Sequence, residues 1–587
     1  MTPTRRTRCL AALPALALAA VAATLGASTS PATAAPKSPG TAAAAAAAAA
    51  AAKPAKPGPP PVELQLLALN DFHGQLEPPT GSSSRLPGFD KDLFGGAEYL
   101  ATQIKALEQQ SKKQNTLTVA AGDLIGASPL VSAAFHDEPS IEALNAIGLD
   151  YASVGNHEFD EGAQELLRIQ DGGCHPVDGC SDPSRPYAGA DFQYLSANAF
   201  VTATGEPLLA PYAIHNVQGI KVGFIGMTLE GTPSVVTPSG VAGLKFTDEA
   251  ETANRYAAEL RAQGVETIIV LLHEGGRQTG AGTSVDGCQD LTGPITSIVP
   301  AMDDAIDVVI TGHTHQAYNC VIDGRVVTSA SSVGRLVTDI DLTLDRRTGD
   351  VLTVMADNVP IVRTVAKNAA QTALIARYRT LLGPIANVVV GQATTLIDRT
   401  AALSGETPLG NLIADAQLAA TVDKGAVAAL MNPGGVRANL EAGPVTYEEA
   451  FAVQPFSNYL STITLTGAQL DCVLEQQYAD GRSTVLQPSA TLSYTVSTSA
   501  AAGTAAAPCS GNKVSAISIG GVAVTPTGSY RITVNNFLAD GGDGFTQLRL
   551  GTARVDTAGD DLDAFVDYLT NKSPVGPPAT DRITVVA

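Results

Sequence analysis

Positive charge is scarce in this sequence. Among its 587 residues, 36 Lys and Arg stand against 57 Asp and Glu, which gives a formal net charge of -21. A protein that coats nucleic acid needs a basic stripe, and a protein that binds an anionic membrane surface needs clustered Lys and Arg. The acidic balance therefore argues against both roles. Charged residues make up 16% and hydrophobic residues 45% of the chain, a composition that suits a packed core and excludes a disordered protein.

Long apolar runs are equally scarce, and the one that occurs is at the N-terminus. The run from Leu10 to Ala27 follows three arginines and precedes a small-residue cleavage site, Ala32-Thr33-Ala34. These features predict a secretory signal peptide over residues 1–34. A membrane anchor is the alternative, and the pair Arg5-Arg6 leaves a twin-arginine export signal open.

Residues 35–61 contain a run of alanines bracketed by Pro, Lys and Gly. Such a run has no partner face on which to pack, and it is predicted to be a disordered Ala/Pro-rich linker. After signal cleavage we expect a secreted, extracellular protein without membrane contact, or a periplasmic one if the source has an outer membrane.

Cysteine is rare and never forms a Cys-x-x-Cys pair, which argues against a zinc knot. Seven cysteines occur, and Cys9 lies in the predicted signal peptide. The other six are an even number, which suits disulfides outside the cell, and six cysteines allow fifteen pairings. Proximity along the chain favours three of these pairs: Cys174–Cys180, Cys288–Cys320 and Cys472–Cys509.

The first half of the chain repeats a strand, a loop and a helix, and metal-competent side chains follow five of the strands. Because ligands of α/β sheets bind beyond the carboxyl ends of the strands, these side chains are expected to converge. The five strands and the blocks that follow them are Leu64–Leu69 with Asn70-Asp71-Phe72-His73-Gly74, Leu117–Ala121 with Gly122-Asp123, Tyr151–Val154 with Gly155-Asn156-His157-Glu158, Thr267–Leu272 with His273-Glu274, and Val308–Ile310 with Gly312-His313-Thr314-His315.

The residue types in these blocks indicate the chemistry. Asp, Asn and His without thiolates suit borderline divalent metals such as Zn, Mn, Fe or Co. Hydrolysis of a phosphate ester benefits from two metals roughly 3.5–4 Å apart, which activate a bridging water and screen the developing charge. One such block would be weak evidence, but five in this order predict a two-metal site.

The five blocks resemble the signature of calcineurin-like metallophosphoesterases. The form Gly155-Asn156-His157-Glu158-Phe159-Asp160 is similar to that of the 5'-nucleotidase family, which includes UDP-sugar hydrolases. The resemblance implies an α/β protein with an N-terminal four-layer α/β/β/α metallophosphoesterase domain and a C-terminal mixed α/β 5'-nucleotidase domain. We expect these domains at residues 62–345 and 391–587, joined by an interdomain connector at 346–390 with a helix from Ala366 to Leu382.

The resemblance also implies roles for the residues of the blocks. The first metal would take Asp71, His73, Asp123 and His315, and the second would take Asp123, Asn156, His273 and His313, so that Asp123 bridges them. A hydroxide bridging the metals would be the nucleophile. His157 would face the phosphate and steady the leaving oxygen, and Asp160 would orient His157 in a dyad. The remaining histidines match no block and are expected to be surface or structural residues: His136, His175 and His215.

The second half has no histidine after His315 and cannot host another histidine-based metal site, so we expect it to bind the substrate. The glycines after Asn432 allow close backbone approach to a ligand. Three motifs stand out in this half: Gly410–Ala416, Asn432–Arg437 and Asn536–Phe545. The alternative interpretation of each motif is a tight turn beside a core aromatic.

The family resemblance extends to this half and implies the substrate contacts. Phe456 and Phe537 would sandwich a nucleobase, since stacking tolerates any base. Asp543 would accept hydrogen bonds from ribose hydroxyls. Asn432 and Arg437 would contact the sugar or the phosphate, the arginine through charge-assisted bonds.

The sequence departs from the family before Gly410-Asn411-Leu412. Family members carry arginines there that reach the phosphate, whereas the aligned position here is Leu403. Arg399, four residues earlier, is a candidate replacement. Arg437 is the other arginine expected near the phosphate. With these cations the site could hydrolyse a cyclic phosphodiester or a nucleotide diphosphate as well as a 5'-monophosphate.

These inferences lead to one hypothesis and three alternatives. The hypothesis is a secreted phosphohydrolase with two divalent metal ions that dephosphorylates extracellular nucleotides, a 5'-nucleotidase of nucleotide catabolism. A 2',3'-cyclic nucleotide phosphodiesterase and a UDP-sugar or nucleotide diphosphate hydrolase would use the same site. The non-enzymatic alternative is a nucleotide-binding adhesive protein whose metal site is vestigial.

Overall fold

The computed structural model describes residues 59–89, 93–111, 115–280, 282–456 and 458–587, which belong to one compact unit, Pro59–Ala587. The predicted signal peptide and nearly all of the predicted linker lie outside the described residues. Within the described part of the chain, no helix has both the length and the apolar character needed to cross a membrane.

Two six-stranded sheets make up the first half of the structure. Strands β1, β2 and β3 pair in parallel in one sheet, and β9 and β12 pair in parallel in the other. The loops that follow parallel neighbours therefore emerge at the same edge of each sheet. The strand order in the first sheet is β16 (Val351–Pro360), β15 (Leu336–Leu344), β1 (Val62–Leu69), β2 (Thr116–Ala121), β3 (Leu149–Ser153) and β4 (Gln193–Leu195). The strand order in the second sheet is β13 (Ala317–Ile322), β14 (Arg325–Ala330), β12 (Val308–Thr311), β9 (Thr267–His273), β7 (Ile220–Thr228) and β6 (Tyr212–Val217).

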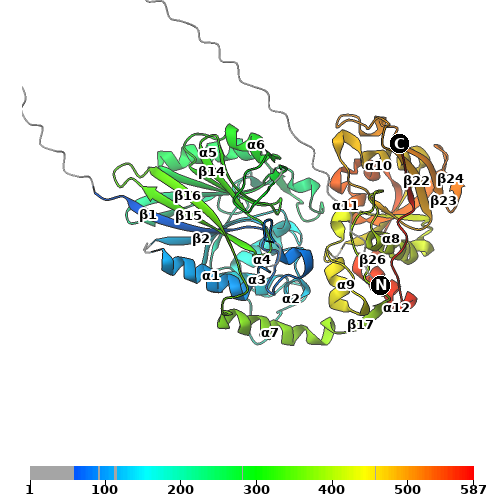
Figure 1. Ribbon diagram of the computed structural model, residues 1–587, viewed down its shortest axis with the longest axis horizontal. Helices are drawn as coiled ribbons and strands as arrows, with labels where there is room; N and C mark the ends of the chain where they lie inside the picture. Colours follow the sequence, from blue (N-terminus) through cyan, green and yellow to red (C-terminus); the bar gives the residue numbers. More distant parts are fainter. Residues whose placement is uncertain (1–58, 90–92, 112–114, 281, 457) are drawn as a thin grey trace, which may run out of the picture. The chain divides into compact units, whose positions relative to one another are not determined.

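The two sheets pack face to face, and helices cover their outer faces. Side chains alternate along β1, so that Leu64 and Leu66 pack with Phe224 and Leu271 of the other sheet. Leu67 points the opposite way, into a cluster with helices α1 (Ala97–Gln110) and α3 (Glu138–Ile147). Helix α5 (Glu249–Ala262) covers the second sheet, on the side away from α1 (Figure 1). The predicted α/β/β/α layering is confirmed.

Residues 346–390, predicted to connect two domains, contain a strand of the first sheet as well as a helix. Strand β16 pairs with β15 along its length. Helix α7 (Ala369–Ala386) begins at the cap Asn368, whose side chain accepts hydrogen bonds from two backbone amides, and it continues through Pro384. The sequence places the helix end before Pro384, but a proline in the last turn removes only one backbone donor, and the helix continues to Ala386.

In its described residues, the second half of the chain has a two-stranded sheet of β17 (Val389–Ala393) and β19 (Gly443–Thr446) and two larger sheets around a shared core. The larger sheets have the orders β21-β18-β25-β20-β26 and β24-β23-β22-β27, and the core includes Leu430, Ile463, Val534 and Tyr494. The elements are α8 (Pro408–Thr421), β18 (Ala428–Met431), α9 (Tyr447–Val453), β20 (Tyr459–Thr466), α10 (Gly467–Gln476), β21 (Gln487–Pro488), β22 (Leu492–Ser497), β23 (Val514–Ile519), β24 (Val522–Ala523), β25 (Ser529–Asn535), α11 (Asn536–Ala539), β26 (Thr552–Asp560), α12 (Asp561–Lys572) and β27 (Ile583–Val586).

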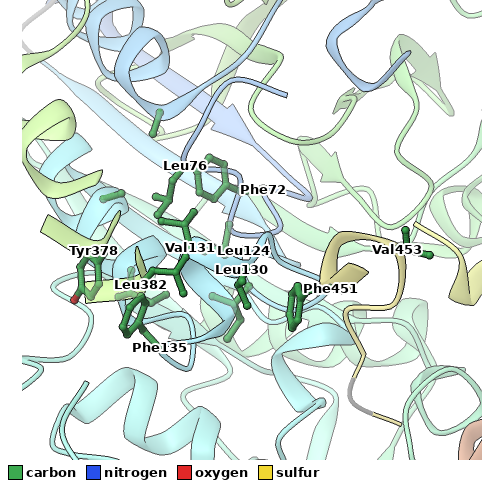
Figure 2. Close-up of a cluster of buried hydrophobic side chains, with 14 of the residues drawn as sticks. Phe72, Leu76, Leu124, Leu130, Val131, Phe135, Tyr378, Leu382, Phe451 and Val453 are labelled. Carbon is green, nitrogen blue, oxygen red and sulfur yellow. The ribbon is translucent and has the colours of Figure 1, made fainter. Parts of the chain in front are cut away.

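An apolar cluster lies directly beneath the loops that follow β1 and β2 (Figure 2). We call it the support cluster. Helix α7 contributes through side chains spaced three or four residues apart, which places them on one helix face. The Tyr378 ring lies 5.0 Å from the Phe135 ring, measured between centroids. The members labelled in Figure 2 are Phe72, Leu76, Leu124, Leu130, Val131, Phe135, Tyr378, Leu382, Phe451 and Val453.

The three disulfides favoured by proximity along the chain are all present. They join Cys174 to Cys180, Cys288 to Cys320 and Cys472 to Cys509. The second links the segment before α6 (Ile295–Ile298) to β13, and the third links α10 to a loop before β23. The predicted pairing is confirmed.

Replacement of Leu382 by alanine should test the contribution of the support cluster. Leu382 is 1% exposed, and a buried Leu→Ala change lowers the free energy of unfolding by about 2–5 kcal/mol. Leu381→Ala is the matched control, because its side chain is 37% exposed on the same helix and should change stability by less than about 0.5 kcal/mol. Urea unfolding of both variants measures the difference, and equal losses would contradict the packing described here.

Candidate functional site

The loops after β1, β2, β3, β9 and β12 bring the predicted metal-binding side chains together. These side chains form two groups of three residues. Within each group, the candidate ligand atoms lie no more than 4.8 Å apart. Asn156 joins the second group, since its Oδ1 lies 3.0 Å from Nδ1 of His313. The first group is Asp71, His73 and His315, and the second is Asp123, His273 and His313.

Asp123 belongs to the second group and also lies near the first. Its Oδ2 is 3.0 Å from Nε2 of His273 and 3.7 Å from Nε2 of His73. Asp71 stands on the other side of the first group, with Oδ1 3.3 Å from Nε2 of His315. A carboxylate that reaches both groups is in the position that a bridging ligand requires.

The hydrogen bonds of the histidines fit this donor set to divalent cations. Nδ1 of His273 donates to the carbonyl of Ala121 at 2.8 Å, and Nδ1 of His73 donates to the carbonyl of Gly126 at 2.9 Å. In a neutral ring this leaves a lone pair on Nε2. The Nε2 of His273 is buried and makes no hydrogen bond in the described residues. Lone pairs that face carboxylate oxygens repel them unless a cation lies between, which is the arrangement of a metal ligand oriented by an outer partner.

The protonation of His73 and His313 agrees with this interpretation. Burial, assisted by the His315 ring, lowers the pKa of His73 to about 3, and burial beside His273 lowers the pKa of His313 to about 4. Both rings are therefore neutral, as metal ligands must be. Burial also lowers the pKa of His273, but the Asp123 carboxylate outweighs it and raises that pKa to about 10. The pair of Asp123 and His273 therefore attracts positive charge.

Five of the seven side chains sit on left-handed backbone. Their φ angles lie between 48° and 68°, a conformation that costs a non-glycine residue about 1–3 kcal/mol and collects at functional sites. In the first loop it turns Asp71 and His73 toward the same point, while Phe72 between them is buried in the support cluster. The five are Asp71, His73, Asp123, His313 and His315.

Two glycines of the motifs leave room for this packing. A Cβ at Gly155 would lie 2.2 Å from Oδ1 of Asp123. A Cβ at Gly122 would lie 2.6 Å from Nδ1 of His273, and the backbone there has a φ of +74°. Neither position can carry a side chain without displacing a candidate ligand.

His157 and Asp160, the predicted dyad, are hydrogen-bonded. Nδ1 of His157 lies 2.7 Å from Oδ2 of Asp160, and the backbone N–H of His157 donates to Oδ1 of Asp123 at 2.9 Å. Burial lowers the pKa of His157, but the carboxylates of Asp160 and Asp123 outweigh it and raise that pKa to about 9. The ring therefore carries a proton next to the candidate metal ligands.

Glu158 is a residue whose role the motif analysis missed. Its carboxylate accepts hydrogen bonds from the backbone N–H groups of Asp123, Leu124 and Gly155, at 3.0, 2.8 and 2.5 Å. It thereby holds the loop after β2 against the loop after β3. The signal for this role in the sequence is the position of Glu158 directly before an aromatic residue, Phe159. Phe159 is fully buried in the structure.

All five predicted substrate-binding residues line one cavity of about 210 Å³ together with Asn156, His157 and His313. Nδ2 of Asn432 donates to Oδ2 of Asp543 at 2.9 Å. The five are Asn432, Arg437, Phe456, Phe537 and Asp543.

Arg437 and Phe456 lie against the dyad. The Phe456 ring is close to parallel with the His157 ring, with 6.0 Å between centroids, and the Arg437 guanidinium lies 5.6 Å from the Phe456 centroid. Burial, together with the nearby charge of Arg399, lowers the pKa of Arg437 below its usual value. The arginine stays a cation at this depth.

A second cavity, of about 550 Å³, adjoins His73 and His315 of the first candidate ligand group. Arg437 lines both cavities, and the second is also lined by His73, His315 and Arg399. Leu403, at the position where family members carry an arginine, is fully exposed and lines neither cavity. Arg399, the replacement suggested by the sequence, lines the second cavity together with Arg437, His73 and His315.

Comparison with known protein families gives two matched regions. Calcineurin-like phosphoesterase matches residues 64–317, and the 5'-nucleotidase C-terminal domain matches residues 389–549. These matches place the chain among metal-dependent phosphoester hydrolases.

Among curated relatives, the chain is 34% identical to endonuclease YhcR of Bacillus subtilis over 86% of its own length, but it spans only 40% of that protein. It is 32% identical to cell wall protein Lmo0130 of Listeria monocytogenes, over 88% of this chain and 68% of the relative. It is 26% identical to a 5'-nucleotidase of Vibrio cholerae, over 87% and 91%. The crystal structure of a 5'-nucleotidase precursor from Thermus thermophilus matches with a TM-score of 0.71 at 27% identity, over 89% of this chain and 99% of that one.

The contact of Gly155 with Asp123 can be tested by Gly155→Ala. The added Cβ must push the Asp123 carboxylate away from both ligand groups, so we expect loss of bound divalent metal, measured by mass spectrometry of the desalted protein. Gly383→Ala in α7 is the control, since a Cβ there meets nothing within 4 Å. A Gly155→Ala protein that folds and retains its full metal content would contradict this geometry.

Proposed function

Because the chain belongs to the 5'-nucleotidase family, we propose that it is a secreted phosphohydrolase that removes phosphate from nucleotides outside the cell, with 5'-monophosphates as substrates. One observation carries the proposal: two of the seven candidate metal ligands, Asn156 and His313, line a cavity together with His157, two phenylalanines and a hydrogen-bonded Asn–Asp pair. The three disulfides and the predicted signal peptide support a location outside the cytosol.

The residues fit two divalent ions. When bound, such ions supply positive charge that stabilises the phosphoryl oxygens and activates water for attack on phosphorus. Asp71, His73, Asp123 and His315 would hold one ion, and Asp123, Asn156, His273 and His313 would hold the other.

His157 would act on the leaving group. Asp160 stabilises its imidazolium form through the 2.7 Å hydrogen bond at Nδ1. The remaining ring N–H can then donate to the oxygen that leaves phosphorus, which offsets the negative charge on that oxygen. Asp160 is a positioning residue in this scheme.

The second half of the chain would recognise the nucleoside. Phe537 and Phe456 line the cavity, and aromatic rings can stack on any base. Asp543 is held by Asn432 through one oxygen, and its carboxylate can accept from ribose hydroxyls. Asn432 is in turn fixed by Asn535, whose Nδ2 donates to it at 3.0 Å.

Arg437 and Arg399 would bind the phosphate. Arg437 lines both cavities described above, and it also lines a third cavity, which is lined by Asp123 and His157. Arg399 lies near enough to lower the pKa of Arg437, and its Nη1 donates to the carbonyl of Val436 at 3.0 Å. We propose that Arg399 supplies the second positive charge that Leu403 cannot.

The decisive experiment is phosphate release from AMP before and after metal removal. EDTA should abolish turnover, because Asp71 and Asp123 then face the phosphate with uncompensated negative charge, and divalent metal should restore it. Asp123→Ala should lower kcat by about a hundredfold or more, since it removes the oxygen ligand that both groups share. AMP binding without phosphate release would favour a vestigial site, and turnover in metal-free protein would contradict the mechanism.

The second cavity favours one further candidate, a hydrolase of substrates with groups on both sides of the scissile phosphate. A nucleoside in the first cavity and a second substituent near Arg399 would span the metal ligands between them. The relative named an endonuclease agrees with such chemistry. Values of kcat/KM for AMP, 2',3'-cyclic AMP, ADP and UDP-glucose, measured side by side, separate the two candidates.

Phe537→Ala tests recognition of the base. Loss of one stacking partner costs about 1–3 kcal/mol, so kcat/KM for AMP should fall about 5- to 150-fold, chiefly through KM. An aryl phosphate without a nucleoside should be hydrolysed nearly as before. Phe537→Tyr keeps the ring and is the matched control. Equal losses on AMP and the aryl phosphate would show that Phe537 does not bind the base.

A further inference from the structure

Arg379 of helix α7 forms ion pairs with both halves of the chain. Its Nε donates to Oε1 of Glu77 at 2.8 Å, and its Nη2 contacts the other oxygen of that carboxylate. Its Nη1 donates to Oε1 and Oε2 of Glu448, at 2.7 and 2.8 Å. Glu77 lies in the loop after β1, in the first half, and Glu448 lies in α9, in the second half. One guanidinium therefore bridges carboxylates from the two halves.

We propose that Arg379 is a positioning residue of the hydrolase. By holding Glu77 and Glu448 together, it sets the place of the substrate-binding side chains of the second half relative to the first group of metal ligands. We call these three side chains the clamp. The proposal rests on the proposed function, and it assigns Arg379 no contact with the substrate.

An arginine suits the clamp because its guanidinium is planar and has donors on two edges. Nε and Nη2 bind one carboxylate while Nη1 binds the other, which a single ammonium group cannot reproduce. The three side chains are partly exposed: 34% for Arg379, 33% for Glu77 and 28% for Glu448. Water screens ion pairs at this exposure, so the clamp contributes modestly to stability. It can bias how the two halves are held without deciding whether the chain folds.

In the first half, the clamp acts next to the loop that carries Asp71 and His73. Leu76, which precedes Glu77, is fully buried in the support cluster, and its carbonyl accepts a hydrogen bond from the N–H of Ala97 at 2.9 Å. Glu77 also lines the second cavity together with His73. The carboxylate of Glu77 is therefore attached to backbone that is fixed relative to the first ligand group.

In the second half, the clamp acts on α9, which positions substrate-binding residues at its other end. Glu448 lies in the first turn of this helix. The carbonyl of Val453, its last residue, accepts a hydrogen bond from the backbone N–H of Arg437 at 2.9 Å. Phe456 lies just beyond α9, in contact with the Arg437 guanidinium. Phe451 and Val453 pack in the support cluster (Figure 2). A displacement of Glu448 would therefore shift Arg437 and Phe456.

A nucleotide must contact both halves at once, because the candidate metal ligands belong to the first half and the stacking phenylalanines to the second. Without the clamp, the halves can adopt other arrangements, and the apparent affinity falls in proportion to the fraction that stays competent. A bound nucleotide contacts both halves and selects the competent arrangement again. We therefore expect the clamp to act on KM and to leave kcat nearly unchanged.

Steady-state kinetics with AMP test the clamp. Arg379→Met, Glu77→Gln and Glu448→Gln each break the bridge, and each should raise KM about 3- to 10-fold with kcat changed by less than about twofold. Arg379→Lys keeps the charge but pairs with one carboxylate, so it should restore KM in part. Arg377→Met is the matched control, since Arg377 lies on the same helix and its ion pair is with Glu142 of α3, within the first half. Its KM should equal that of the parent.

A double variant separates the bridge from a general loss of stability. If Arg379 acts through Glu448, adding Glu448→Gln to Arg379→Met should raise KM no further, whereas independent effects would multiply. A role in stability alone would lower the free energy of unfolding, measured in urea, without a change in KM. Folded Arg379→Met and Glu448→Gln proteins with the KM of the parent would overturn the proposal.

Hydrogen–deuterium exchange separates failure of the clamp from failure of the proposed function, because it needs no substrate. Peptides that cover α9 should exchange faster in Arg379→Met and Glu448→Gln than in the parent and in Arg377→Met. If the chain does not hydrolyse AMP, the proposed function fails while this difference in exchange remains. If AMP is hydrolysed and α9 exchanges at the same rate in all these proteins, the assignment of Arg379 is wrong.

Discussion

The structure of the site depends on the burial of two carboxylates, Asp71 and Asp123. Both are 0–1% exposed, and a buried negative charge is tolerated only where positive charge or strong hydrogen bonds compensate it. The Nε2 atoms of His73 and His273 both face the Asp123 carboxylate, at 3.7 and 3.0 Å. Divalent cations resolve this concentration of electron-rich atoms. The left-handed backbone at the ligands and the glycine at position 155 are the local costs of assembling it.

The rest of the first half keeps these groups in place. Residues that alternate with the ligands, Phe72 beside Asp71 and Leu124 beside Asp123, anchor the loops in the support cluster. Helix α7 closes this cluster through Tyr378 and Leu382 (Figure 2). Backbone strain at the ligands is therefore balanced by apolar burial directly beneath them, since each buried large side chain contributes about 1.5–3 kcal/mol. Glu158 links the two loops from within, through backbone amides.

Charge on this protein acts locally. The chain carries a net charge of -21, yet Arg437 and Arg399 line cavities that also contain candidate metal ligands. Those two arginines come from the second half of the chain, and the metal ligands come from the first. The two regions meet where Phe456, which lies against Arg437, stacks beside His157. An acidic surface favours solubility and does not oppose an anionic substrate at such a site.

The sequence alone predicted the strands that carry the motif blocks, the convergence of the seven candidate ligands and the three disulfides. These follow from local signals, because apolar periodicity marks strands and parallel strands deliver their following loops to one edge. It could not predict that Glu158 ties two loops, that β16 belongs to the first sheet, or that α7 passes Pro384. Nor could it show that His136 stacks on His175, residues assigned to the surface or to structure. Each of these depends on contacts between distant segments, which periodicity does not report. The residue types were set by the sequence, and their partners were decided only when the chain packed.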